Sequence, residues 1–284
     1  MIKIIKSVKE MANFANRIKG RGHTIALVPT MGALHEGHLS LVEAAHNKAN
    51  IVVVSIYVNP TQFAPNEDFN KYPRTLLKDK TALRHFEHIT IFAPSDKELY
   101  PDTFDTWVEE GTISKKLCGK FRFGHFKGVT TILSKLFNVV RPDFAFFGEK
   151  DYQQQLIVKK LVKDLNYPID VIICPTIREY DGLAMSSRNK YLSPKERKAA
   201  AVLYKTLIRA KKDLEGGETD YRRIIVGLSR LIGFEPLIRI DYITIVNPDT
   251  LIEIKEIKKE KVLVALAARV GKTRLIDSMI VQPK

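Results

Sequence analysis

Residues 24–42 read TIALVPTMGALHEGHLSLV, an apolar run followed by a glycine-containing loop and a helical pattern. Thr24–Val28 is short and apolar, and it is predicted to be a buried strand that ends at Pro29. A helix is predicted from about residue 39 to residue 48. The order strand, loop, helix is the repeating unit of α/β proteins.

The same alternation continues along the first part of the chain. Apolar runs predict further strands at Ile51–Val58, Ile89–Phe92, Phe144–Phe147 and Ile169–Cys174. Helical patterns lie between them at Arg74–Glu87, Val129–Val140 and Tyr152–Leu165. This pattern predicts an α/β fold with a doubly wound, Rossmann-like parallel sheet. Ligands in such sheets bind beyond the carboxyl ends of the strands.

The pattern changes after about residue 190. Pro194–Leu214 is predicted to be one long charged helix with Ser193 as its N-cap, broken by Gly216-Gly217. A second helix and three strands are predicted to follow at Tyr221–Ile232, Leu237–Val246, Lys261–Ala268 and Thr273–Ser278. We therefore expect a Rossmann-like domain over residues 1–176 and a smaller α+β domain over residues 177–284.

Composition excludes several classes of protein. The 284 residues include 46 Lys and Arg against 32 Asp and Glu, a net charge of +14. The basic residues are dispersed, which favours anionic metabolites over nucleic acid as partners. Cys118 and Cys174 form no CxxC pair, so a zinc ribbon is not expected. Residues 1–20 lack the apolar core of a signal peptide, and no apolar run approaches a membrane span of about 20 residues. We expect a cytoplasmic protein with no membrane partner.

His35 and His38 lie at the start of the first predicted helix. A helix N-terminus offers unpaired N–H groups and partial positive charge, and imidazoles placed there can donate to phosphate. Gly37 leaves room for a base or ribose to approach the backbone. A metal pair is the alternative, but zincin histidines are four apart and no third ligand is evident. Two ordinary surface histidines are the other alternative.

Three further stretches follow predicted strands or join the domains. Gly148–Asp151 offers a lysine for phosphate and an aspartate for ribose hydroxyls, or else an ordinary helix cap. Met185–Asn189 offers hydroxyls and an arginine that can clamp phosphate, or else a polar loop. Asn59–Phe63 places Gln62 where an amide can bind a small hydroxy acid, although a turn with no binding function would have the same composition.

Together these motifs closely resemble the pantothenate synthetase (pantoate–β-alanine ligase) family, within the HxGH nucleotidylyl-transferase-like superfamily. The resemblance runs almost end to end, through PTMGALHEGHLSLV at 29–42, VSIYVNPTQF at 54–63, NEDFNKYPRT at 66–75, GHFKGV at 124–129, FGEKDYQQ at 147–154, REYDGLAMSSRN at 178–189, YLSP at 191–194 and RLID at 274–277. Phe123 stands where the family usually has proline, and Ser278 where asparagine is common.

The resemblance implies an ATP-dependent ligase that makes pantothenate from pantoate and β-alanine through an enzyme-bound pantoyl adenylate, releasing AMP and pyrophosphate. It also implies Mg²⁺ with the ATP, no resident metal, and a homodimer. The adenylate must be shielded from water, so the C-terminal domain is expected to act as a lid.

The resemblance also assigns site residues. The catalytic residues would be His38 as proton donor, with His35, Lys150 and Arg188. ATP would be bound by Met31, Gly32, Ala33, Leu34, His35, Glu36, Gly37, His38, Gly148, Glu149, Lys150, Asp151, Ile177, Met185, Ser186, Ser187 and Arg188. Pantoate would be held by Gln62 and Gln154, and Asn59 and Tyr72 would lie on the β-alanine side.

Two alternatives stay open. Another HxGH-type adenylyl transferase, or a relative of the tRNA synthetases, would use the same loop on a different acid. A basic RNA-binding protein that kept a nucleotide fold is the alternative outside enzymes, and dispersed lysines with Trp107 as the one tryptophan argue against it.

The His38→Ala variant tests the assigned proton donor. We expect it to lower adenylate formation at least ~100-fold, the usual contribution of a positioned proton-transfer group. The measurement is pantoate-dependent pyrophosphate release, and a near-normal rate in the variant would remove His38 from this role.

Overall fold

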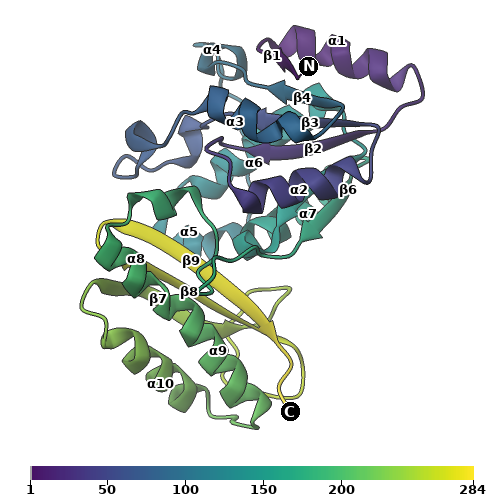
Figure 1. The fold of residues 1–284 in the computed structure, drawn as a ribbon. Coiled ribbons are helices and arrows are strands. Elements are labelled where there is room, and N and C mark those ends of the chain that lie inside the picture. The colour runs from purple at the N-terminus through teal and green to yellow at the C-terminus, as the bar shows by residue number, and fades with distance from the viewer. Residues whose placement is uncertain (1) are drawn as a thin grey trace. The chain divides into compact units, whose positions relative to one another are not determined.

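The computed structural model describes residues 2–284, which form two compact units (Figure 1). Unit 1 extends to Lys115 and also includes Arg122–Glu149 and Gln154–Pro175. Unit 2 comprises Lys116–Phe121, Lys150–Gln153 and Thr176–Lys284. Two short segments from the first part of the chain therefore belong to the second unit.

Unit 1 is built on a six-stranded parallel sheet, which confirms the predicted fold class. Its strand order is β1 (Lys3–Ile5), β4 (Ile89–Phe92), β3 (Ile51–Ile56), β2 (Ile25–Thr30), β5 (Phe144–Gly148) and β6 (Asp170–Cys174). The chain runs outward from β2 through β3 to β4, and then returns to β5 on the other side of β2. The loops after β2 and β5 thus diverge at the switch point where such sheets bind ligands.

The helices of unit 1 cover both faces of this sheet. They are α1 (Val8–Lys19), α2 (Glu36–His46), α3 (Leu76–Ala82), α4 (Asp96–Leu99), α6 (His125–Val140) and α7 (Tyr152–Asp164). In β2, Ile25 and Leu27 pack into the cluster that contains α1 and α6, whereas Ala26 and Val28 pack into the cluster that contains α2. This alternation follows from the two-residue period of a strand.

The strand β2 is longer than predicted, because it continues through Pro29 to Thr30. Proline has no N–H to give to a neighbouring strand, so it is usually excluded from the middle of a sheet. Here β2 pairs with β5 only at Ala26 and Leu27, whereas its pairing with β3 extends to Thr30. Pro29 therefore lies where one side of the strand is already unpaired, which the sequence alone does not reveal.

Unit 2 contains a three-stranded antiparallel sheet in the order β7 (Ile238–Val246), β8 (Val262–Val270), β9 (Thr273–Val281). Its helices are α5 (Cys118–Phe121), α8 (Pro194–Ala200), α9 (Val202–Glu215) and α10 (Tyr221–Gly233). The buried face of α10 presents Ile224, Leu228 and Ile232, spaced four apart, to the core that the sheet and α9 share.

The prediction of a single helix over Pro194–Leu214 is wrong in one respect. The predicted N-cap is confirmed, and Ser193 forms a capping box with Glu196. The helix, however, is interrupted at Ala201 and forms α8 and α9. Ala201 keeps right-handed helical angles (φ −60°, ψ −20°). The interruption contains neither glycine nor proline, so the sequence gives no signal for it.

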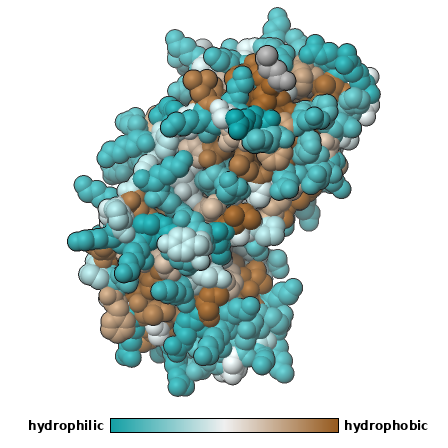
Figure 2. Space-filling model, viewed as in Figure 1, coloured by the Kyte–Doolittle hydropathy of each residue, from teal (hydrophilic) through white to brown (hydrophobic). Residues whose placement is uncertain are grey.

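Hydrophilic side chains cover most of the face seen in Figure 2, and apolar side chains form smaller patches on it. Among residues 2–284, none of the helices is both long enough and apolar enough to span a bilayer.

Replacing Leu228 by alanine tests the core of unit 2. Leu228 is fully buried, so the cavity is expected to cost about 2–5 kcal/mol of unfolding free energy. Val226, on the same helix, is 50% exposed, and Val226→Ala should change stability by no more than about 0.5 kcal/mol. Chemical denaturation measures both, and equal effects would contradict this assignment of the core.

Candidate active site

The loop after β2 is held by a buried carboxylate. Asp79, on α3, is 2% exposed. Its two oxygens accept the backbone N–H groups of Ala33 at 3.2 Å and Leu34 at 2.9 Å. The Thr75 hydroxyl donates to the same carboxylate at 3.2 Å. Gly32 (φ +80°) and Ala33 (φ +51°) both have left-handed backbone angles, so this carboxylate stabilises a conformation that alanine rarely adopts.

The two histidines of the loop lie together at the start of α2. His35 is the N-cap residue, and its carbonyl accepts the N–H groups of His38 at 2.7 Å and Leu39 at 3.1 Å. The imidazole rings of His35 and His38 are 4.1 Å apart between centroids. Glu36 and Gly37 occupy the first helical turn between them. Two imidazole rings therefore lie together at a helix N-terminus, an arrangement that suits an anion.

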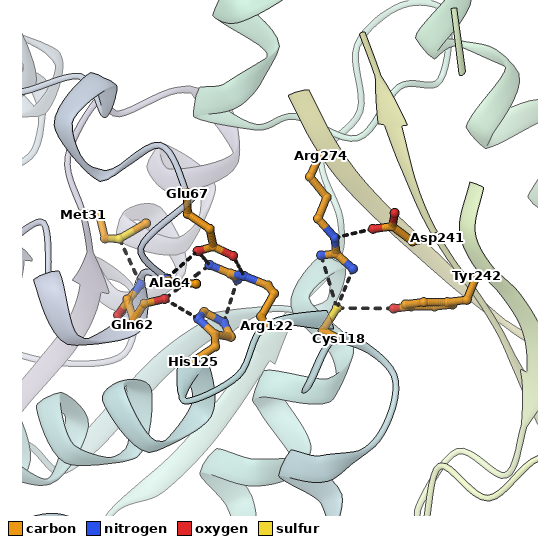
Figure 3. A network of polar contacts seen from close by, with 10 residues as sticks. All are labelled: Met31, Gln62, Ala64, Glu67, Cys118, Arg122, His125, Asp241, Tyr242 and Arg274. Carbon is orange, nitrogen blue, oxygen red and sulfur yellow. Dashed lines mark hydrogen bonds and ion pairs between the residues drawn. The ribbon is translucent and has the colours of Figure 1, made fainter. Parts of the chain in front are cut away.

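Gln62 lies after β3 and contacts the histidine loop through Met31 (Figure 3). Its side-chain N–H donates to the Met31 sulfur at 3.0 Å, and its side-chain oxygen accepts from Asn59 at 3.1 Å. Asn59 is 1% exposed and also donates to the Gly128 carbonyl at 3.1 Å. The structure thus brings together three of the predicted site residues, Met31, Asn59 and Gln62.

The other predicted residues of unit 1 lie on neighbouring elements. Tyr72 is buried and packs edge-on against Phe63, with 5.9 Å between ring centroids. Gly148 ends β5 and Glu149 follows it, at the switch point described above. Gln154 is half-buried in the first turn of α7.

Lys150 and Asp151 belong to unit 2, together with Gln153. The Lys150 ammonium lies 3.0 Å from the Asp151 carboxylate. The Gln153 amide accepts the N–H of Cys118 at 2.9 Å and donates to the carbonyl of Lys116 at 2.7 Å. The segment that presents the lysine is thereby fastened to residues 116–121.

That second segment is in turn fastened to the sheet of unit 2 (Figure 3). The Cys118 thiol lies 3.3 Å from the Tyr242 hydroxyl and accepts from the Arg274 guanidinium at 3.7 Å. Asp241 accepts from Arg274 at 2.7 Å. Burial, with a further contribution from Cys118, raises the pKa of Tyr242 well above its usual value.

The predicted phosphate clamp also lies in unit 2, on a loop that folds back on itself. Met185 donates its N–H to the Ile177 carbonyl at 3.0 Å, which brings the two ends of the loop together. The Ser186 hydroxyl accepts the N–H of Arg188 at 3.3 Å and caps the turn that contains the buried Ser187. Ile177, Met185, Ser186, Ser187 and Arg188 are therefore held on one short, ordered loop.

Sequence reasoning missed the ion pair that anchors this loop. Arg178 binds Asp277 with both ends of its guanidinium, at 2.6 and 3.0 Å, and Asp277 is 3% exposed. Burial raises the pKa of Asp277, and hydrogen bonds from Arg178 and the charge of Lys150 oppose that rise. Both residues lie in stretches that carry the family resemblance, which was the available signal. Asp79 gave no signal beyond being an acidic residue in a helical pattern.

Replacing Asp79 by asparagine tests the support of the histidine loop. The asparagine amide keeps one acceptor oxygen and loses the other, so we expect the free energy of unfolding to fall by about 1–3 kcal/mol. Hydrogen exchange at Ala33 and Leu34 should accelerate. Asp102 is exposed, and Asp102→Asn serves as the matched control with no such effect. Unchanged exchange at both amides would show that the carboxylate does not hold the loop.

Comparisons with known proteins agree with this arrangement. The family model for pantoate-beta-alanine ligase matches residues 3–280. The pantothenate synthetases of Acetivibrio thermocellus and Thermosipho africanus are 50% and 49% identical, each over 99% of this chain and 100% of the relative.

Solved structures agree as well. A pantothenate synthetase structure from Thermus thermophilus superposes with a TM-score of 0.93 at 41% identity, over 99% of this chain and 100% of that one. The pantoate-beta-alanine ligase of Francisella tularensis, complexed with beta-gamma ATP and beta-alanine, superposes with a TM-score of 0.82 at 33% identity, over 99% and 98%. The fold, the placement of the motifs and these matches confirm the resemblance, and the chain belongs to the pantoate–β-alanine ligase family.

Proposed function

We propose that this protein condenses pantoate with β-alanine at the expense of ATP. The pantoate carboxylate attacks the α-phosphorus of ATP and displaces pyrophosphate, and the amine of β-alanine then attacks the acyl carbon of the adenylate and displaces AMP. The observation that carries the proposal is the pair His35 and His38 at the N-terminus of α2, beside the switch point and linked through Met31 to Gln62.

The first step requires neutralisation of charge, because a carboxylate must approach a polyanion. We assign this task in unit 1 to the imidazoles and N–H groups of residues 31–38, with His38 protonating the departing phosphate oxygen. In unit 2 we assign it to Lys150 and Arg188, with Ser186 and Ser187 donating hydrogen bonds. Gly148 and Asp151 are assigned to the ribose, Ile177 to the adenine through its backbone, and Met185 to the phosphates. Glu149 is assigned to ATP binding without a narrower role.

Mg²⁺ is proposed to arrive as Mg·ATP. Within residues 2–284 no three His, Cys, Asp or Glu side chains are grouped so as to hold a metal ion. Mg²⁺ is commonly held by substrate phosphates with only one or two carboxylates, so we propose that the phosphates of ATP supply most of its ligands.

Pantoate is assigned to Gln62 and Gln154, whose amides both donate and accept and so suit its hydroxyls and carboxylate. Tyr72 is assigned to the β-alanine side. Asn59 is fully enclosed and bonded to both Gly128 and Gln62, so we propose that it acts on the substrates by orienting Gln62. The homodimer, the cytoplasmic location and the role of unit 2 as a lid stay predictions.

Separating the half-reactions tests the proposal. With Mg·ATP and pantoate alone, the enzyme should release about one pyrophosphate per active site, and sustained AMP formation should require β-alanine. Absence of a pantoate-dependent signal from a folded protein that still binds ATP would instead favour an adenylyl transferase acting on another acid.

A further inference from the structure

We propose that His125 and Arg122 are positioning residues for Gln62, which they hold in the orientation that receives pantoate. The inference rests on the proposed function, in which Gln62 binds that substrate. All of these residues belong to unit 1 (Figure 3).

The backbone carbonyl of Gln62 is the point on which the two side chains converge. The His125 Nδ1 lies 2.8 Å from this oxygen, and Arg122 Nη2 donates to it at 3.3 Å. The two side chains also meet each other, because Arg122 Nη1 lies 2.8 Å from His125 Nε2. The three groups form a closed triangle of hydrogen bonds.

This triangle fixes the tautomer of His125. A guanidinium can only donate, so His125 Nε2 must accept from Arg122. The remaining proton of the neutral ring is then on Nδ1, which donates to the Gln62 carbonyl. His125 is 8% exposed, so its ring nitrogens are largely shielded from water and rely on hydrogen bonds within the protein.

Arg122 is itself held in place by Glu67. The guanidinium binds both oxygens of this carboxylate, from Nε at 2.6 Å and from Nη2 at 2.7 Å. The two side chains are only 13% and 19% exposed. A bidentate pair of this kind fixes direction as well as distance, so Arg122 is aimed at both His125 and Gln62.

The backbone around Gln62 is also closely packed. A Cβ added at Gly128, on α6, would overlap the Thr61 carbonyl and crowd the Gln62 nitrogen. The Gly128 carbonyl accepts from Asn59, which also binds the side-chain oxygen of Gln62. Main chain and side chain of Gln62 are therefore both preset before substrate binds, which lowers the cost of ordering them at that moment.

Two substitutions of His125 separate positioning from packing. Phenylalanine is similar in size to the ring but cannot donate, whereas asparagine is smaller and carries an N–H near the place of Nδ1. We expect His125→Phe to raise the KM for pantoate about 10-fold with the KM for ATP within about twofold. His125→Asn should restore the pantoate KM to within about threefold of the parent.

A matched control is available on the surface of the same unit. Arg84 donates to His85 at 3.2 Å, and this Arg–His pair is exposed. His85→Phe removes a similar contact away from Gln62 and should leave every kinetic constant unchanged. Thermal unfolding of each variant reports whether it is folded, and Arg122→Lys, which loses the bidentate contact to Glu67, replaces His125→Phe should that variant fail to fold.

Two measurements decide the inference. An unchanged pantoate KM in the folded His125→Phe variant, or His125→Asn impaired as much as His125→Phe, would overturn it. Hydrogen exchange over residues 59–67 needs no substrate, and it should accelerate in His125→Phe and be largely restored in His125→Asn. Unchanged exchange would refute the positioning role, whereas absent pyrophosphate release in the parent would refute only the proposed function.

Discussion

Two backbone amides beyond the carboxyl end of β2 donate to one buried carboxylate, and the placement of the histidine pair depends on this contact. Parallel strands end in loops whose N–H groups have no neighbouring strand to bind. Asp79 accepts two of them and stabilises the left-handed angles at Gly32 and Ala33. The direction in which α2 begins, and thus the placement of His35 and His38, follows from this loop.

In unit 2, buried hydrogen-bond acceptors likewise hold the segments that carry Lys150 and Arg188. Asp277 binds Arg178 at the base of the loop that carries Ser186–Arg188. Gln153, Cys118 and Arg274 connect the segment of Lys150 to the sheet of unit 2. Lys150 and the serine loop consequently belong to one compact unit, although about 35 residues separate them in the sequence. Each set of proposed phosphate ligands is thus presented by rigid supports.

Most strands and helices of this fold could be predicted from local sequence patterns. The elements and site residues that were not predicted have physical reasons. Ile89–Phe92 was predicted to the residue, because this buried run lies between the polar pair Glu87-His88 and the strand-ending Pro94. The strand β1 was not predicted, since it has only three residues and Lys3 is exposed. The helix α1 was also not predicted, although its buried residues Met11, Ala15 and Ile18 have helical spacing. Of the site, the motif residues could be named, but their supports Asp79, Arg122 and Asp277 could not be. Their partners lie 46, 60 and 99 positions away in the sequence, so only the folded chain brings them together.

The most direct test of the central claim is hydrogen exchange with and without pantoate and a Mg-bound ATP analogue that cannot release pyrophosphate. We expect protection of residues 31–38, because Asp79 holds this loop and we propose that His35 and His38 bind the nucleotide. Protection confined to other parts of the chain would contradict this assignment.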